Sequence, residues 1–345
     1  MNIGVQACAV GLDIHKKIIA FCVKRPDGQI VREGKLEASR AALKEWAGEL
    51  PQPCQVAMEA TIFTGWIYDF LQRHLPRQCA VKVGHPAMMK AIVAAKNKND
   101  KLDARLIADL LRCDLLPEIY MAPAELRDLR RALRFRNFTL KLSVSLKNKN
   151  AGLLLEYGQQ YQKGKLHQKK YFAELLERLE GVPDAVKELL QYDHQMLGLF
   201  QFAQRRLVAQ LRGDERLAAR VERLMSIPGV GEITALTWAL EVGDPARFSS
   251  ARKARSYCGL CSAQKESAGK MRRMPLSKQR NKYLQRVLIE AAKLAPNFNP
   301  QLRAVYDKQA QKGNRNQATL AVARKLVDYL MAVDKSGEPF ALRAA

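Results

Sequence analysis

The chain has 345 residues, 48% of them hydrophobic, which is enough apolar material for a sizeable core and more than one domain. Its 58 Lys and Arg against 34 Asp and Glu give a formal net charge of +24, which favours nucleic acid, ahead of an anionic membrane surface, as its partner. We find no run of about 18 apolar residues and no signal-peptide pattern, so we expect a cytoplasmic protein without membrane spans.

Residues 1–122 are expected to form an α/β domain, because short apolar strands alternate with segments of helical spacing. The segment "RPDGQ" at 25–29 is a strong turn signal that follows a strand. The predicted strands are 7–13, 18–24, 53–60 and 78–86, and the predicted helices are 40–50, 65–75 and 104–116.

Residues 123–223 are expected to form long helices, as a helical pair or a coiled coil, because Gly and Pro are sparse and apolar residues recur at helical spacing. The stretch 127–149 is rich in basic side chains and has Asp128 as its only acid. Arg130, Arg131 and Arg134 are therefore candidates for contact with nucleic acid. An ordinary solvated helix face would explain the same charges.

Residues 224–345 are expected to form a mainly α-helical domain. The segment "IPGVGEITA" at 227–235 matches a helix-hairpin-helix turn, whose backbone N–H groups suit a DNA phosphate, although a simple packing turn looks alike. The stretch 251–290 is strongly basic, with Glu266 and Glu290 as its only acids. Its candidates for contact with nucleic acid are Lys270, Arg272, Arg273, Lys278 and Arg280.

The cysteines do not suggest a disulfide framework, because the 7 of them are scattered over the chain. Cys258 and Cys261 have the spacing of half a zinc site, but no second pair and no nearby His complete it. We interpret them as small buried apolar residues.

Acidic residues stand out in the first domain because they lie where an α/β sheet exposes its strand ends and at the start of a helix. Asp13 and Glu59 end predicted strands, and Asp100 and Asp103 open a predicted helix on one face. Each is explained singly by a strand end, a surface position or a helix cap. Together, in a basic chain, they indicate a site for divalent metal ions, Mg²⁺ or Mn²⁺, because a metal would offset their mutual repulsion.

Several segments of the chain are similar to one protein family. The segments "GLDIHKK", "MEAT" and "KNDKLDARLIADLL", followed by "LMSIPGVGEITALTWALEVGDPARFSSARKARSYCGL" and "SKQRNKYLQRVLIEAA", resemble the DEDD insertion-sequence transposases of insertion-sequence family 110 and the related Piv-type DNA invertases. The resemblance covers nearly the whole chain in the right order. It implies a ribonuclease-H-like, RuvC-type fold for 1–122, a coiled-coil dimerisation region over 123–223 and a C-terminal transposase domain over 224–345.

The resemblance also implies site residues. It makes Asp13, Glu59, Asp100 and Asp103 the metal-binding acids and places a catalytic serine at Ser267, in "KESAGK", with Ser262 and Ser277 as nearby alternatives. We expect Ser267 to lie in a Gly-containing basic loop, where its hydroxyl can approach a phosphate. Nothing nearby in the sequence supplies a general base for it.

The sequence departs from the family pattern in two places. Members commonly have Gly soon after Glu59, whereas here Gly65 is displaced, and they often have Gly where this chain has Gln279 and Arg280. These departures leave the acids intact and affect only the expected loop geometry.

By resemblance, the chain is a transposase that cuts and rejoins double-stranded DNA through a covalent phosphoserine link, guided by a structured bridge RNA and acting as a homodimer or tetramer. Three alternatives stay open. A site-specific DNA invertase would use the same chemistry, and a Holliday-junction-type nuclease would use water in place of serine. A non-catalytic nucleic-acid-binding protein would need none of it.

Overall fold

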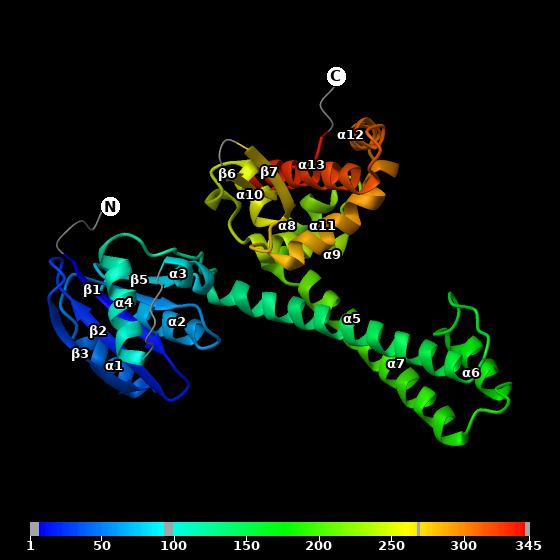
Figure 1. Ribbon diagram of the computed structural model, residues 1–345, viewed down its shortest axis with the longest axis horizontal. Helices are drawn as coiled ribbons and strands as arrows, with labels where there is room; N and C mark the ends of the chain where they lie inside the picture. Colours follow the sequence, from blue (N-terminus) through cyan, green and yellow to red (C-terminus); the bar gives the residue numbers. More distant parts are fainter. Residues whose placement is uncertain (1–6, 93–98, 268–269, 342–345) are drawn as a thin grey trace. The chain divides into compact units, whose positions relative to one another are not determined.

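The computed structural model describes residues 7–92, 99–267 and 270–341, and of 263–267 and 270–274 it describes the backbone alone. The chain divides into two compact units, Met1–Ala124 (unit 1) and Glu125–Ala345 (unit 2), each with its own core (Figure 1). The domain boundaries at 122 and 223 stay predictions. None of the described helices is both long enough and apolar enough to cross a membrane.

Unit 1 is built on a five-stranded sheet with the strand order β3-β2-β1-β4-β5. The first three strands form antiparallel hairpins, whereas β4 runs parallel to β1 and β5 runs parallel to β4. Parallel neighbours need crossover connections, and helices α1 and α2 supply them. The strands are β1 (Cys8–Ile14), β2 (Ile18–Lys24), β3 (Ile30–Glu37), β4 (Cys54–Glu59) and β5 (Ala80–Gly84), and the helices are α1 (Arg40–Gly48), α2 (Thr64–His74), α3 (Pro86–Ile92) and α4 (Asp100–Arg112).

The two faces of this sheet carry side chains of different size. On one face, large residues such as Leu12 and Met58 belong to the same buried cluster as side chains of α1 and α2. On the other face Ala9, Gly11 and Ala57 are small, and helix α4 packs there. Small side chains let the helix backbone come close to the strands.

Gly11 shows how close that approach is. A Cβ atom at this position would lie 2.1 Å from the carbonyl oxygen of Ala104 and 2.5 Å from the amide nitrogen of Ala108, both on the backbone of α4. Any side chain at position 11 would therefore push the helix away from the sheet. Gly11 thus positions the first turn of α4 near the carboxyl end of β1.

The α/β character predicted for this part of the chain is confirmed by the sheet and its helices. The structure adds β3 and α3, which were not among the predicted elements. The residues of β3 are largely exposed, so the strand lacks the apolar run that marks β1 and β2.

Unit 2 begins with a pair of long helices, α5 (Ala124–Glu156) and α7 (Asp184–Arg212), which lie side by side (Figure 1). Gln204 on α7 donates a hydrogen bond of 3.0 Å to the hydroxyl of Ser143 on α5. At one end of the pair, α6 (Lys169–Glu177) completes a small core around Leu154, Phe172 and Leu190. The helical character expected here is confirmed, and the coiled coil stays a prediction.

The remaining helices of unit 2 enclose the larger core, in which Trp238 is fully buried. Helix α9 is buried along almost its whole length, and most of its residues are apolar. It follows α8 through a turn in which Gly229 has φ +90°, a backbone conformation that favours glycine. The helices are α8 (Glu215–Met225), α9 (Glu232–Val242), η1 (Pro245–Arg247), α10 (Ala251–Tyr257), α11 (Lys282–Leu294), η2 (Ala295–Asn297), α12 (Pro300–Ala310) and α13 (Arg315–Ser336).

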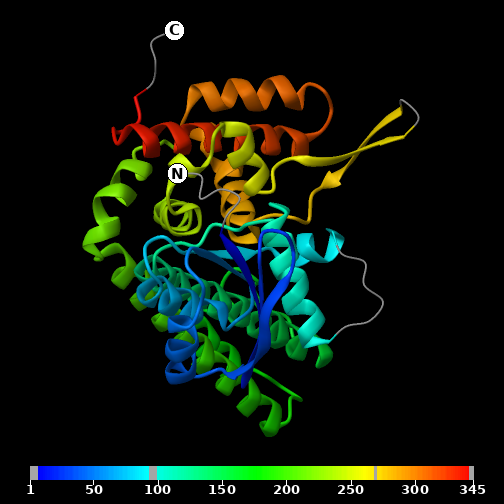
Figure 2. The same cartoon turned by 90° about the vertical axis from the view of Figure 1, so that its left-hand side faces the viewer.

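A β-hairpin interrupts these helices. Strands β6 (Ser262–Ser267) and β7 (Lys270–Leu276) pair in antiparallel fashion, with Ser267 opposite Lys270, and project from the helical cluster (Figure 2). The prediction of a loop around Ser267 is wrong, because Ser267 is the last residue of β6. The segment lacks the apolar alternation that identifies strands from sequence, and its partner strand defines it instead.

Candidate functional site

The carboxyl ends of the parallel strands β1 and β4 bring two of the predicted acids to one edge of the sheet. Asp13 lies near the end of β1, and Glu59 is the last residue of β4. Leu12 pairs with Met58 in parallel register. The next residues, Asp13 and Glu59, therefore point to the same face of the sheet as each other. That face is covered by α4, since Gly11, two residues before Asp13, contacts the helix backbone.

The other two predicted acids lie in the first turn of α4. Asp100 is its first residue, and Asp103 follows three residues later on the same side of the helix. The helix is capped by Asn99, whose Oδ1 accepts a hydrogen bond from the amide of Leu102 at 2.8 Å. The interpretation of these aspartates as the helix cap is therefore wrong, whereas their place in the first turn of a helix is confirmed.

The carboxylates of Asp13 and Asp100 meet at the imidazole ring of His15. Its Nε2 atom lies 3.0 Å from Oδ2 of Asp13 and 3.3 Å from Oδ1 of Asp100. Lys35 donates a hydrogen bond of 2.9 Å to the other oxygen of Asp100. Ligand atoms of Asp13, His15 and Asp100 all lie within 4.8 Å of one another, and no other group of His, Cys, Asp and Glu in the described residues could hold a metal ion in this way.

The charges in this group act on one another. Burial raises the pKa of the Asp13 carboxyl, His15 lowers it, and the neighbouring carboxylates of Asp103 and Asp100 raise it further. The pKa of Asp100 is lowered, mainly by its hydrogen bond from Lys35. Asp13 thus carries its negative charge in an unfavourable setting, beside other acids and partly out of water.

The donor set fits a divalent metal ion. Carboxylate oxygens are ligands that both Mg²⁺ and Mn²⁺ accept, and an imidazole nitrogen suits the transition metal better than magnesium. The side chain of Asp13 is 16% exposed and that of Asp100 is 40% exposed, so an ion can reach both from solvent. A divalent cation would relieve the repulsion that raises the pKa of Asp13.

Glu59 and Asp103 belong to the same edge of the sheet but lie outside the compact group around His15. Asp103 is close enough to raise the pKa of Asp13. Glu59 is partly exposed at the end of its strand. Their roles as metal ligands stay predictions.

Threonines shape the turn after Glu59, where the family pattern has glycine. The hydroxyl of Thr64 donates to the backbone oxygen of Glu59 at 3.0 Å and accepts from the amide of Thr61 at 2.7 Å. Gly65 lies inside α2. Side-chain hydrogen bonds thus stabilise the turn that a glycine would otherwise permit.

His15 and Lys35 were not predicted as members of the site. The signal for His15 is its spacing, since it follows Asp13 by two residues in "DIH" at a strand end, where alternate residues point the same way. Lys35 comes from β3, a strand that the sequence pattern did not reveal, so only the folded sheet brings it to Asp100.

Ser267 belongs to unit 2, at the end of β6. Its side chain, like those of Lys270, Arg272 and Arg273, lies outside the described part of the structure, so their predicted roles are untested. Lys278 and Arg280 follow β7 and are exposed. Arg280 donates to the backbone oxygen of Ser277 at 2.7 Å.

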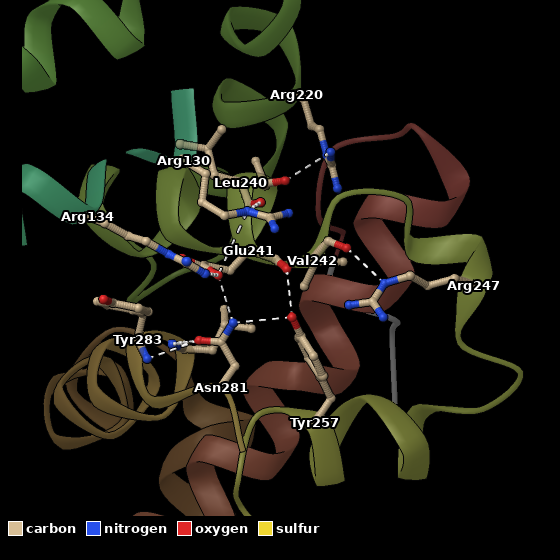
Figure 3. Close-up of polar contacts among 12 residues, drawn as sticks. Arg130, Arg134, Arg220, Leu240, Glu241, Val242, Arg247, Tyr257, Asn281 and Tyr283 are labelled. Atoms are coloured by element: carbon tan, nitrogen blue, oxygen red, sulfur yellow. Dashed lines mark hydrogen bonds and ion pairs between the residues drawn. The ribbon is translucent and has the colours of Figure 1, made fainter. Parts of the chain in front are cut away.

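The basic residues predicted on α5 lie in different surroundings. Arg134 makes a two-pronged hydrogen bond, 2.8 Å on each side, to Glu241, whose side chain is fully buried (Figure 3). Arg130 donates to the backbone oxygen of Leu240 at 2.8 Å. Arg131 is 69% exposed and pairs with Asp128. The packing thus gives Arg130 and Arg134 a structural task, and contact with nucleic acid stays a prediction for all three.

Comparisons with known proteins identify related sequences over most of the chain. Residues 10–159 match a sequence model for a transposase of the DEDD type found in IS110, and residues 221–307 match a model described as "Transposase IS116/IS110/IS902 family". The transposase for insertion sequence element IS1328 of Yersinia enterocolitica is 27% identical over 341 residues, 96% of this chain and 98% of that protein. The transposase for IS1111A of Coxiella burnetii is 26% identical over 338 residues, 94% of this chain and 88% of that protein.

Proposed function

Because the chain belongs to the IS116/IS110/IS902 family of transposases, and is therefore an enzyme of DNA strand transfer, we propose that it cuts and rejoins the DNA strands of an insertion sequence with metal ions and a serine nucleophile. The non-catalytic alternative no longer applies. The observation that carries the proposal is the convergence of Asp13 and Asp100 on His15 at the edge of the sheet.

The proposed fold of unit 1 is ribonuclease-H-like, of the RuvC type. Its support is the mixed sheet of order β3-β2-β1-β4-β5, with an antiparallel part and a parallel part that meet at β1. The acids of the site come from β1, β4 and the helix packed on β1. This arrangement brings the carboxylates of Asp13 and Asp100 together from separate parts of the sequence.

The proposed metal is Mg²⁺, or Mn²⁺, held by Asp13 and Asp100 with Glu59 and Asp103 nearby. When bound, it would polarise a DNA phosphate and stabilise the negative charge that develops there. The protein contributes a frame, because α4 packs on Gly11 through the backbone of Ala104 and Ala108, directly after the turn that carries Asp100 and Asp103. His15 and Lys35 hold Asp13 and Asp100 in place by hydrogen bonds.

The proposed nucleophile is Ser267. Its Oγ atom would form a bond to phosphorus while the bond from phosphorus to one deoxyribose oxygen breaks, and the serine proton would pass through solvent to the departing hydroxyl. The phosphoserine link keeps the strand activated, so that a second hydroxyl can later take the phosphate back without a high-energy cofactor. The position of Ser267 at the end of β6 supports the proposal, since a β-hairpin that projects from the helical cluster (Figure 2) can approach a duplex.

The proposed partners are double-stranded DNA and a guide RNA that pairs with it. The net charge of +24 supports a polyanionic partner, because neutralising phosphates releases counterions from the nucleic acid. Base pairing would then select the DNA sites, and the protein would hold the backbones.

The proposed assembly is a homodimer or tetramer formed through the long helices. Helix α7 is apolar on two opposite sides: Leu190 and Leu197 are buried against the same chain, whereas Leu189, Tyr192, Met196 and Leu199 are between 38% and 68% exposed. The exposed set has the alternating spacing of three and four residues that is typical of a coiled-coil seam. A second copy of α7 is the partner that such a seam fits.

The test is an assay of purified protein with Mg²⁺, a donor and target DNA pair, and RNA transcribed from the DNA beside the reading frame. Covalent protein–DNA adducts and joined products are expected for the wild type and for Ser262→Ala. Both should be lost with Ser267→Ala and with Asp100→Ala.

Metal-dependent cleavage that persists in Ser267→Ala would contradict the serine mechanism and favour a nuclease that uses water. Products that invert a segment without moving it would identify an invertase with the same chemistry. Adducts that require Ser277 in place of Ser267 would reassign the nucleophile. Reaction without the RNA would remove the guide from the proposal.

A further inference from the structure

Unit 2 contains a pocket of about 490 Å³ whose charged lining is mainly basic. It lies between α5, the second half of α7 and the first residues of α9. Its charged lining consists of Arg136, Arg205 and Arg212, opposed by Glu232. Arg212 donates a hydrogen bond of 3.0 Å to Glu232, which leaves the other two guanidinium groups to be explained.

Arg136 is the pocket residue that has a buried donor without a hydrogen bond. Its Nε atom is buried and has no hydrogen-bond partner among the described residues. Its Nη1 atom donates a hydrogen bond of 3.1 Å to the side-chain oxygen of the adjacent Asn137. Burial, and after it the nearby Arg286, lower the pKa of Arg136, although the group remains charged. A partly buried guanidinium beside another cation is unfavourable unless an anion joins it.

The first turn of α9 adds to this positive potential. Glu232 and Ile233, its first residues, line the pocket, and the N-cap residue Gly231 has no side chain that could cap the helix. Backbone N–H groups at a helix N-terminus attract anions, and this helix start belongs to the helix-hairpin-helix-like turn. The pocket thus combines guanidinium groups and a helix N-terminus at one place.

We propose that this pocket binds a phosphate group of a nucleic-acid backbone. Arginine suits the role because its planar fork can donate two hydrogen bonds to a phosphate at once. The pocket is open to solvent, and Gln201 in its lining carries a further amide donor. The inference rests on the proposed function, which supplies nucleic acid as the anion, and it adds a second contact region that is separate from the metal site.

The test measures the affinity of the full chain for a fluorescein-labelled DNA duplex and, separately, for a labelled RNA duplex over a series of KCl concentrations. Arg136→Gln and Arg205→Gln are each expected to weaken binding about tenfold at low salt and to reduce the slope of log K against log[salt] by about one. Arg206→Gln is the matched control, because Arg206 is the next residue on α7, is exposed and does not line the pocket.

The two nucleic acids identify the source of the phosphate. Losses with DNA alone assign the pocket to the DNA path, losses with RNA alone assign it to the RNA path, and losses with both assign it to either backbone. Pocket variants that bind both duplexes as tightly as Arg206→Gln would overturn the inference. A wild type that binds neither duplex would instead contradict the proposed function.

Thermal unfolding separates binding from folding. Removing an unsatisfied buried cation should leave the melting temperature of Arg136→Gln, free of nucleic acid, equal to or above that of the wild type. A clear drop would show that Arg136 is needed for folding and would count against the inference. The exposed Arg205→Gln variant then gives the binding result without that complication.

Discussion

Asp13 is the residue whose surroundings most clearly serve something other than stability. Burial and the neighbouring acids raise the pKa of its carboxyl, so the folded state holds the proton more tightly than the unfolded state does. The stability of the metal-free protein should therefore fall as pH rises from the ordinary aspartate pKa, about 3.9, through the raised value. This destabilising charge is what a bound cation would offset.

Asp13→Asn should therefore raise the melting temperature of the metal-free protein by a few degrees at neutral pH and should abolish the further rise that Mn²⁺ causes in the wild type. Asp27→Asn, at an exposed turn of the same unit, is the control and should change neither quantity. Thermal unfolding with and without Mn²⁺ measures both. An unchanged response of Asp13→Asn to Mn²⁺ would exclude Asp13 as a ligand.

Glu33 shows the opposite pH dependence. Hydrogen bonds from Arg105 and Lys101 lower its pKa to about 2, so its contribution to stability is present above the unfolded-state pKa, about 4.3, and is lost as pH falls toward 2. Glu33→Gln should lower the melting temperature at pH 7 and should approach the wild type near pH 2. Glu37→Gln, exposed on the same strand, should show no such convergence.

At the scale of elements, the packing of α4 on β1 decides the geometry of the metal site. Gly11→Ala would place a Cβ atom within 2.5 Å of the α4 backbone, so the helix must move. We expect a loss of about 1–3 kcal/mol in the free energy of unfolding, together with weaker Mn²⁺ binding. Gly152→Ala is the control, because an added Cβ there meets nothing within 4 Å. Denaturant unfolding and a Mn²⁺ titration measure the two effects. Normal Mn²⁺ affinity in a destabilised Gly11→Ala variant would show that the packing of α4 on Gly11 does not decide the geometry of the metal site.

At the scale of the whole molecule, the exposed seam on α7 should set the assembly. Leu199→Glu places a charge in the seam, at a residue that is 68% exposed, and should convert the assembly to monomers without lowering the melting temperature of the chain's own core. Gln191→Glu adds the same charge on α7 outside the seam and should not. Light scattering after size-exclusion chromatography measures the mass. An unchanged mass for Leu199→Glu would move the interface elsewhere.

The sequence by itself determined the class of the protein and most of its elements. Strands such as β1 and β4 are short and mostly apolar, and the acids at their ends can be identified from position alone. The net charge predicted a polyanionic partner because charge is a property of composition. The family resemblance, which the comparisons bear out, rests on motifs that are local in sequence.

Only the tertiary structure decided the contacts between distant residues. It brought His15 and Lys35 to Asp100, gave the cap of α4 to Asn99, and paired Ser267 into a hairpin that its polar sequence conceals. It also gathered Arg136, which lies on α5, with Arg205 on α7, more than one helix away along the chain. Such contacts depend on how helices and strands pack, and packing joins residues whose separation in sequence carries no local signal.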